Sequence, residues 1–197
     1  MKPNMKQNMK QTIVTLLAAL ACTCAATASA SVITFDDLPG DGNTPIYNGY
    51  AGFNWDNFGT VASDVGAGIG FAVGTVSGPN AAFNWSGQAS TISRADGGTF
   101  PFTGAWFASA LVDQEISFEG SLQGQVVHAT EAFTIETGVP RWIELDWTDI
   151  DALTIYNSSP TQWTMDDVAL PEPGSLALFG GALAGLLGAR RRCRRTR

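Results

Sequence analysis

Two pairs of adjacent aspartates lie near the two ends of the acidic segment 31–170. Asp36 and Asp37 occur in the stretch ITFDDL, and Asp166 and Asp167 occur in WTMDDVAL. Carboxylate oxygens are the ligands that Ca²⁺ prefers, and the two pairs together could supply part of its coordination shell. The alternative is that each pair ends a strand in a turn exposed to water. Both a structural calcium site and two simple turns stay open.

A second group of residues could bind an organic ligand. Tyr47, Tyr50 and Trp55 lie in the stretch IYNGYAGFNW, which is rich in glycine and asparagine. An exposed aromatic ring offers an apolar face with a polar edge, so it could stack on a sugar, with Asn48 and Asn54 beside it. Loops at the ends of a sandwich commonly carry binding function. The alternative is that these rings belong to the hydrophobic core.

The chain carries no recognisable catalytic motif. It has neither a Gly-x-Ser-x-Gly elbow nor a His-Glu-x-x-His pair. Its one histidine, His128, lies among apolar residues in a strand pattern, where a structural or surface role is expected. Hydrolysis of a glycoside needs only two carboxylates, and the many acidic residues leave that alternative open. We therefore predict no catalytic residue and no enzymatic activity.

Short segments in which apolar and polar residues alternate, separated by Gly, Pro, Asn and Asp, must position these residues. We expect strands at 32–35, 70–77, 90–94, 105–112, 115–120, 125–136, 141–147, 152–156 and 162–170. Between the fifth and sixth of these, a hairpin is expected to turn at Gln123–Gly124. One wet and one buried face are typical of antiparallel sheets. The pattern predicts an all-β fold, an antiparallel jelly-roll β-sandwich.

Charge and cysteine content narrow the class of protein. Residues 31–170 contain 17 acidic residues and two basic ones, Arg94 and Arg141, a formal charge of −15. Such a surface repels phosphate backbones, so we expect no nucleic-acid partner. The three cysteines, Cys22, Cys24 and Cys193, lie outside this segment, which excludes a disulfide within it.

The N-terminus has the pattern of a secretory signal peptide over residues 1–30. Lysines at positions 2, 6 and 10 precede a short apolar run, Ile13–Ala21. Ala28 and Ala30 then fit the small-residue rule for cleavage, which is expected after Ala30 by signal peptidase. The segment predicts an exported protein.

The C-terminus, residues 171–197, has three parts. The triplet Pro171, Glu172, Pro173 cannot be helical, and an apolar run with four glycines follows it over 176–189. As a helix this run would rise about 21 Å, short of the ~30 Å hydrocarbon core. It could serve as a temporary membrane anchor, with the basic tail on the cytoplasmic side; that tail begins with Arg190, Arg191 and Arg192.

This ending resembles the PEP-CTERM sorting signal of exopolysaccharide-producing Gram-negative bacteria. That family joins a Pro-Glu-Pro motif, a short glycine-rich transmembrane helix and an arginine-rich tail, and requires a signal peptide; all are present here in order. The resemblance implies an exosortase partner that removes the tail. It also implies a protein held transiently in the inner membrane and then released or anchored at the cell surface or in the extracellular matrix.

Segment 31–170 resembles the jelly-roll domains found upstream of such signals, which begin with Phe-Asp-Asp/Glu-Leu and end with Met-Asp-Asp/Asn-Val/Ile. It is more distantly similar to carbohydrate-binding jelly rolls, several of which hold calcium between their first and last strands. Three functions follow as alternatives. The first is a non-enzymatic matrix protein associated with exopolysaccharide, the second is a carbohydrate-binding adhesin module, and the third is a secreted glycoside hydrolase.

Overall fold

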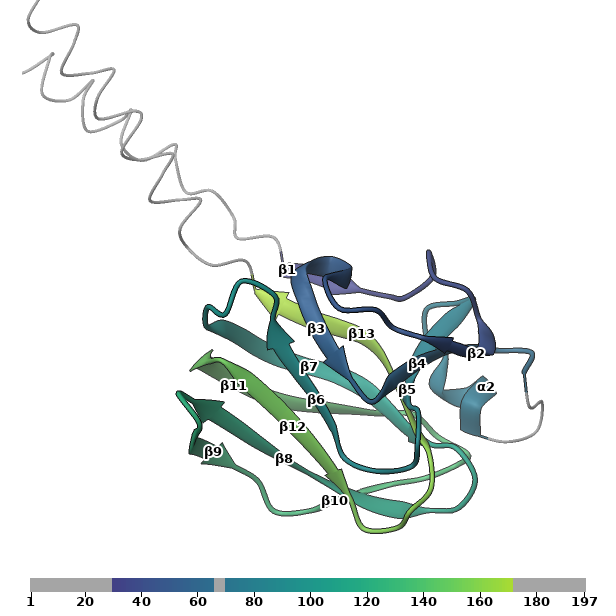
Figure 1. The fold of residues 1–197 in the computed structure, drawn as a ribbon. Coiled ribbons are helices and arrows are strands. Elements are labelled where there is room, and N and C mark those ends of the chain that lie inside the picture. The colour runs from purple at the N-terminus through teal and green to yellow at the C-terminus, as the bar shows by residue number, and fades with distance from the viewer. Residues whose placement is uncertain (1–29, 66–69, 172–197) are drawn as a thin grey trace, which may run out of the picture. The chain divides into compact units, whose positions relative to one another are not determined.

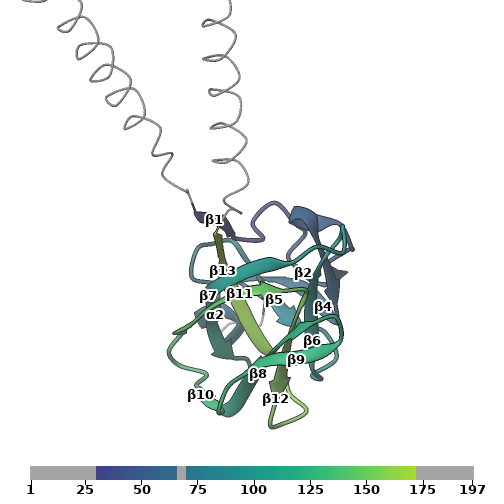
Figure 2. The same cartoon turned by 90° about the vertical axis from the view of Figure 1, so that its left-hand side faces the viewer.

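The structure is a computed structural model that describes residues 30–65 and 70–171. These residues form two antiparallel sheets packed as a sandwich (Figures 1 and 2), so the all-β, jelly-roll type of fold predicted from the sequence is confirmed. Sheet A has the order β11-β7-β13-β5-β4-β2, with β1 paired to β13. Sheet B has the order β10-β8-β12-β6-β3, with β9 paired to β8.

The strands of sheet A are β1 (Ala30–Ile33), β2 (Asp41–Pro45), β4 (Phe58–Ala62), β5 (Asn80–Asn84), β7 (Phe100–Ser109), β11 (Arg141–Ile150) and β13 (Trp163–Pro171). Those of sheet B are β3 (Phe53–Asp56), β6 (Ser90–Arg94), β8 (Gln114–Leu122), β9 (Gln125–Ala129), β10 (Phe133–Ile135) and β12 (Ala152–Asn157). Two short helices complete the described residues, η1 (Tyr50–Gly52) and α2 (Gly70–Gly74).

The core between the sheets is built from large aromatic and β-branched side chains. Its largest fully buried members are Trp163, Phe35, Phe58, Phe100, Phe102, Phe107, Phe118, Ile92, Ile116, Ile135, Ile143 and Ile150. Edge-on ring pairs connect the two sheets, for example Phe107 of sheet A with Phe118 of sheet B at 5.4 Å between centroids. A core of this size holds the domain together without a disulfide.

Strand β11 shows how a local irregularity changes an alternating pattern. Ile143 is 2% exposed and Glu144 is exposed, as alternation predicts. Leu145 and Trp147, however, are only half-buried against the core, because the register with β7 shifts between Glu144 and Trp147. Asp146 adopts a left-handed φ of 49° at this bulge, and a bulge of this kind re-aims the side chains beside it.

The expected hairpin at Gln123–Gly124 is confirmed. Both residues have positive φ, 53° and 75°, between the ends of β8 and β9, as a tight two-residue turn requires. On β9, the His128 ring stacks on Trp147 of β11 at 5.1 Å between centroids. His128 thus bridges the edges of the two sheets, which fits the structural role expected for it.

The strand expected at 70–77 is wrong. Its first residues form helix α2, which packs on the outer face of sheet A against β7 and β13. Gly70 and Gly74, four residues apart on one helix face, permit this approach, because a β-carbon on Gly70 would overlap Ser109 O and one on Gly74 would overlap Thr164 Oγ1. The tertiary contact, rather than the local pattern, decides the helix.

Strands β2, β3, β4 and β5 were not expected from the pattern. Strand β2 has the sequence DGNTP, which is typical of a turn, and lies at the edge of sheet A, where Gly and Pro are tolerated. All five residues of β5 are buried, the two terminal asparagines included, so this strand has no exposed face and its sequence does not alternate. Helix α2 contributes to that burial, since Phe71 lies edge-on to Phe83 of β5 at 5.8 Å.

The first and last strands lie side by side. Ser31 pairs with Leu170 and Ala30 with Pro171, so the chain enters and leaves the sandwich at one point.

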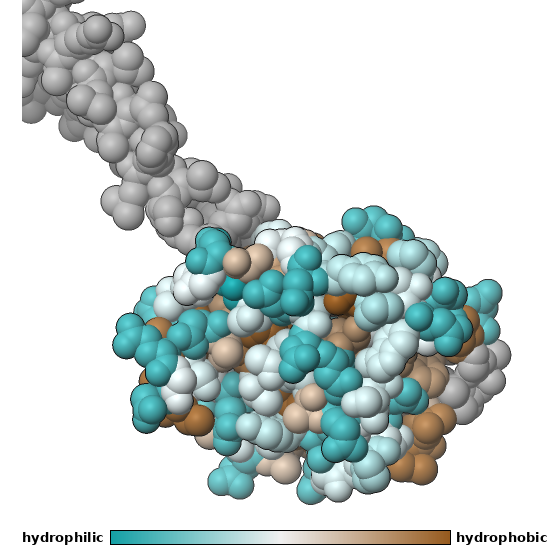
Figure 3. Space-filling view, in the orientation of Figure 1, coloured by the Kyte–Doolittle hydropathy of each residue, from teal (hydrophilic) through white to brown (hydrophobic). Residues whose placement is uncertain are grey.

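Figure 3 shows a face of the molecule that is largely hydrophilic, with hydrophobic residues scattered among polar ones. Neither helix within the described ranges has the length and apolar character to cross a membrane. The expected sorting helix at 176–189, the basic tail and the signal peptide up to residue 29 lie outside those ranges.

Candidate groove beside Tyr47

A groove of about 300 Å³ lies between strand β2, the turn before it and the loop that leads into η1. Its lining is mostly apolar and includes no charged side chain. The lining residues are Leu38, Pro39, Thr44, Pro45, Tyr47, Asn48, Tyr50 and Thr60. Two of the three aromatic residues proposed from the sequence as sugar contacts, Tyr47 and Tyr50, are therefore brought together here.

Tyr47 is the exposed aromatic residue of the groove. Its side chain is 72% exposed, the largest value among the exposed large hydrophobic residues of the described chain. A single exposed ring is common on protein surfaces, and it leaves the Tyr47 phenol available to a ligand. An exposed phenol offers an apolar face for stacking and a hydroxyl for a hydrogen bond.

Tyr50 is half-buried and forms the fixed side of the groove. Its hydroxyl donates to Asp37 Oδ1 at 2.7 Å, and its ring stacks on Phe35. Burial, followed by the hydrogen bond to Asp37, raises the pKa of the Tyr50 phenol above its usual range. The hydroxyl therefore stays protonated and keeps the turn at Asp37 joined to η1.

Trp55 lies in the core and does not line the groove, contrary to the sequence-based expectation that it contacts a sugar. It is 4% exposed and packs edge-on against Phe58 and Phe35 in the core. Its indole Nε1 donates to Tyr50 O at 3.0 Å, and its backbone N–H donates to Asn48 Oδ1 at 2.9 Å. Through these two hydrogen bonds Trp55 anchors the loop to the core. Its ring points inward because Phe53 and Trp55 occupy the buried positions of the alternating strand β3.

The backbone of the loop is sharply bent. Gly49, Ala51 and Gly52 all have positive φ, of 96°, 50° and 83°, a region that glycine enters at little cost. These bends, together with the anchoring by Trp55, hold Tyr47 and Tyr50 on one wall of the groove. The aromatic count of the loop suggested a site, but the lining by Leu38, Pro39 and Thr60 could not be read from the sequence.

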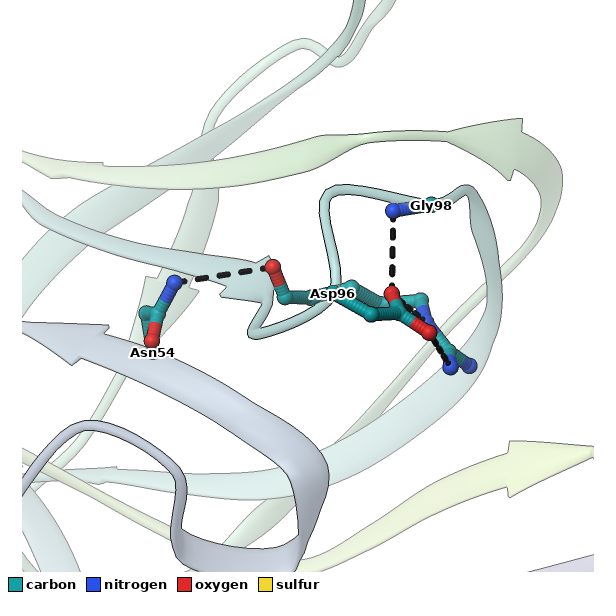
Figure 4. Close-up of polar contacts among 4 residues, drawn as sticks. Asn54, Asp96 and Gly98 are labelled. Atoms are coloured by element: carbon teal, nitrogen blue, oxygen red, sulfur yellow. Dashed lines mark hydrogen bonds and ion pairs between the residues drawn. The ribbon is translucent and has the colours of Figure 1, made fainter.

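Asn54 takes no part in the groove. Its amide donates to Arg94 O of the neighbouring strand β6 at 3.5 Å (Figure 4). The same figure shows the turn after β6, where Arg94 pairs with Asp96 and the Gly98 N–H donates to Asp96 Oδ1 at 2.9 Å. The Arg94 guanidinium, followed by that N–H, holds the pKa of Asp96 well below its usual range. This cluster closes the turn between β6 and β7.

Three of the four aspartates proposed as calcium ligands accept hydrogen bonds from different protein donors. Asp36 Oδ1 accepts from the Asn80 N–H at 3.1 Å, and Asp37 accepts from Tyr50. Asp166 is fully buried and accepts from the N–H groups of Val76 and Ser77 at 2.8 Å each.

Asp167 has a positive φ of 50° at the bulge in β13. Within residues 30–65 and 70–171 no group of three or more His, Cys, Asp or Glu side chains is placed to hold a metal ion. Calcium binding through Asp36, Asp37, Asp166 and Asp167 stays a prediction.

The end of strand β13 is the second functional feature. Residues 169–192 match the family model of the PEP-CTERM protein-sorting motif. The chain carries a PEP-CTERM sorting motif. The motif begins inside β13, since Ala169 and Leu170 are strand residues and Pro171 pairs with Ala30. The first three residues of the PEP-CTERM motif are therefore also the last three residues of the sandwich's strand β13.

A comparison with curated proteins gave no match. Among solved structures, the Clostridium thermocellum endo-1,4-β-D-xylanase 10B (CBM22-1–GH10 modules) complexed with xylohexaose is similar at a TM-score of 0.43 and 12% identity. That alignment covers 76% of this chain and 29% of the xylanase chain. TmCBM61 in complex with β-1,4-galactotriose is similar at a TM-score of 0.35 and 11% identity, over 70% of this chain and 97% of that one. At these TM-scores neither structure bears on the ligand of this chain.

Proposed function

We propose that this is a non-enzymatic exported protein, which an exosortase sorts to the cell surface and whose sandwich holds neutral polysaccharide of the extracellular matrix. The observation that carries the sorting step is the PEP-CTERM motif at residues 169–192. The expected signal peptide at 1–30 is consistent with it, because a C-terminal sorting signal acts only on a chain that has reached the membrane.

The groove beside Tyr47 supports the binding step. A polysaccharide chain presents apolar ring faces and hydroxyl groups, and the groove offers an exposed aromatic ring next to Asn48 and Thr44. Its lining carries no charge. The body around it is strongly acidic, so it would repel anionic polymers at moderate ionic strength. A neutral polysaccharide is the ligand class that fits both facts.

The test is retention of the exported protein on immobilised neutral polysaccharides, with xylan, galactan and cellulose as the panel. Tyr47→Ala should weaken retention about tenfold, the effect of losing one stacked ring. Tyr156→Ala is the matched control, because Tyr156 is also an exposed tyrosine but lies on β12 and bonds Glu119. Equal retention of the wild type and Tyr47→Ala would refute the groove as the binding site, and failure of the wild type to bind any neutral polymer would refute the binding step.

A further inference from the structure

Three loops meet at the end of the sandwich where β5, β12 and β7 finish. They are the β5–β6, β12–β13 and β7–β8 loops, and hydrogen bonds tie them together. Asn157 Nδ2 donates to Gly87 O at 3.0 Å, and Gln162 Nε2 donates to Trp85 O at 3.3 Å. The Ala110 N–H donates to Gln162 O at 2.9 Å. The loops are therefore fixed relative to one another before any ligand arrives.

A pocket of about 250 Å³ lies between these loops. It is lined by Trp85, Ser86, Gly87, Leu111, Pro160, Thr161 and Gln162, and it shares no lining residue with the groove beside Tyr47. Gly87 is required here, because its φ is +69° and a β-carbon would lie 3.0 Å from Pro160 O. The close approach of these two loops shapes the pocket.

Trp85 lines the pocket, and its neighbours hold its indole ring rigidly. Trp85 is half-buried, and its indole stacks on Phe83 at 5.7 Å between centroids with an interplanar angle of 22°. It also lies over Gly59, where any β-carbon would overlap the ring. Leu111, which is 50% exposed, adds an apolar edge. A ligand that stacks on this indole would therefore not have to immobilise a flexible side chain, which is a cost that weakens binding.

The polar groups of the pocket are uncharged. The Ser86 hydroxyl donates to Asn57 Oδ1 at 2.8 Å, which leaves its oxygen able to accept. Gln162 uses its amide N–H on Trp85, and within the described residues no donor reaches its amide oxygen. A suitable ligand therefore carries hydroxyl donors and one apolar face, and bears no charge.

We infer that this pocket is a second sugar site, which holds a single pyranose ring such as a chain end or side branch. Its volume lies below the ~300–1,000 Å³ of typical small-molecule sites, which favours one ring over a chain. The ligand class rests on the proposed function, but the site itself does not need the Tyr47 groove. Two sites on one domain would let the protein link two polysaccharide chains.

The pocket also lies at the far end of β13 from the sorting motif. Gln162 directly precedes the first residue of β13, and Pro171 is its last. Nine strand residues span about 30 Å. The pocket therefore lies about 30 Å along β13 from Pro171, the last residue of that strand.

The experiment is ¹⁹F NMR of the exported protein labelled with 5-fluorotryptophan, titrated with the methyl pyranosides of glucose, galactose, mannose and xylose. The Trp85 resonance, assigned by its loss in Trp85→Phe, should shift saturably with at least one of these sugars. Leu111→Glu should weaken that response about tenfold by placing a charge at the apolar edge. Val112→Glu is the matched control, because Val112 is 54% exposed, adjacent in sequence and not part of the lining.

A Trp85 resonance that no sugar moves would overturn the second site, as would equal losses in Leu111→Glu and Val112→Glu. Tyr47→Ala should leave the Trp85 response unchanged. If Tyr47→Ala loses polysaccharide retention while Trp85 stays silent, the proposed function stands and this inference fails. If Trp85 responds while Tyr47→Ala retains full binding, the second site stands and the Tyr47 groove fails.

Discussion

At the scale of single residues, Asp166 shows how one buried carboxylate can serve packing. It lies on the outer face of sheet A, where it accepts the N–H groups of Val76 and Ser77 and so holds the segment after α2 against β13. Removal from water raises the pKa of Asp166 to about 6, and the hydrogen bonds that its carboxylate accepts from backbone N–H groups offset part of that rise. The same residue was proposed from the sequence as a calcium ligand, and its oxygens are already engaged by protein donors.

The raised pKa of Asp166 predicts a pH-dependent stability. The folded state binds this proton more tightly than the unfolded chain, whose carboxyl has the ordinary value of 3.8. This contribution to stability is therefore complete below about pH 4 and is lost as the pH rises through about 6. Thermal melts across this range should show a shallower decline in Tm for Asp166→Asn than for the wild type.

Asp149→Asn is the control for that measurement, because Asp149 is exposed and its left-handed φ of 58° suits asparagine. Its decline should follow that of the wild type. Parallel declines in Asp166→Asn and the wild type would show that Asp166 does not titrate in this range.

At the scale of elements, helix α2 shows a short segment whose structure depends on its neighbours. Five residues are too few for a helix to be stable alone, so packing on sheet A must stabilise it. Gly70 and Gly74 give α2 a flat face that reaches the backbone of β7 and the side chain of Thr164 on β13. The two glycines matter because they carry no side chain, which allows this close approach.

Substitution of Gly74 should separate close packing from backbone flexibility. Gly74→Ala adds a methyl group that overlaps Thr164 Oγ1, so we expect a loss of about 1–3 kcal/mol in the free energy of unfolding. Gly78→Ala is the matched control, since a β-carbon there meets its nearest neighbour, Thr75 Cγ2, at 3.9 Å. Denaturant unfolding measures both, and equal effects would contradict the packing explanation.

At the scale of the whole molecule, the pairing of β1 with β13 joins the structure to the sorting route. Ala30, after which signal cleavage is expected, pairs with Pro171, the first residue of the Pro-Glu-Pro triplet. The expected signal-peptidase site and the first residue of the Pro-Glu-Pro triplet therefore lie side by side in sheet A. Removal of the signal peptide after Ala30 would leave most of β1 in place, because the pairing of Ser31 with Leu170 is kept.

We expect the exported protein to begin at Ser31 and to lack the arginine tail. Replacing Pro171, Glu172 and Pro173 by alanine should leave the chain in the membrane with its tail intact, because the exosortase signal is lost. Intact-mass measurement of the membrane and secreted fractions tests both statements. Pro140→Ala, a proline before β11, is the control and should be processed normally. Normal processing of the triplet variant would exclude the exosortase route.

The sequence by itself determined the features that depend on local pattern. The PEP-CTERM motif is read from consecutive residues, the Gln123–Gly124 turn from a glycine between two strand patterns, and strands such as β6 from their alternation and β-branched residues. Each of these signals acts over a few neighbouring residues, so no distant contact is needed to recognise it.

Only the tertiary structure decided which aromatic residues reach solvent and which helix forms. Tyr47 and Trp55 are only eight positions apart, yet one is exposed and the other is in the core. Helix α2 depends on strands β7 and β13, which lie far along the chain. Burying an apolar side chain is favourable because it removes apolar surface from water. Which side chains are buried therefore depends on the surfaces that the fold brings together, and a local sequence pattern does not contain that information.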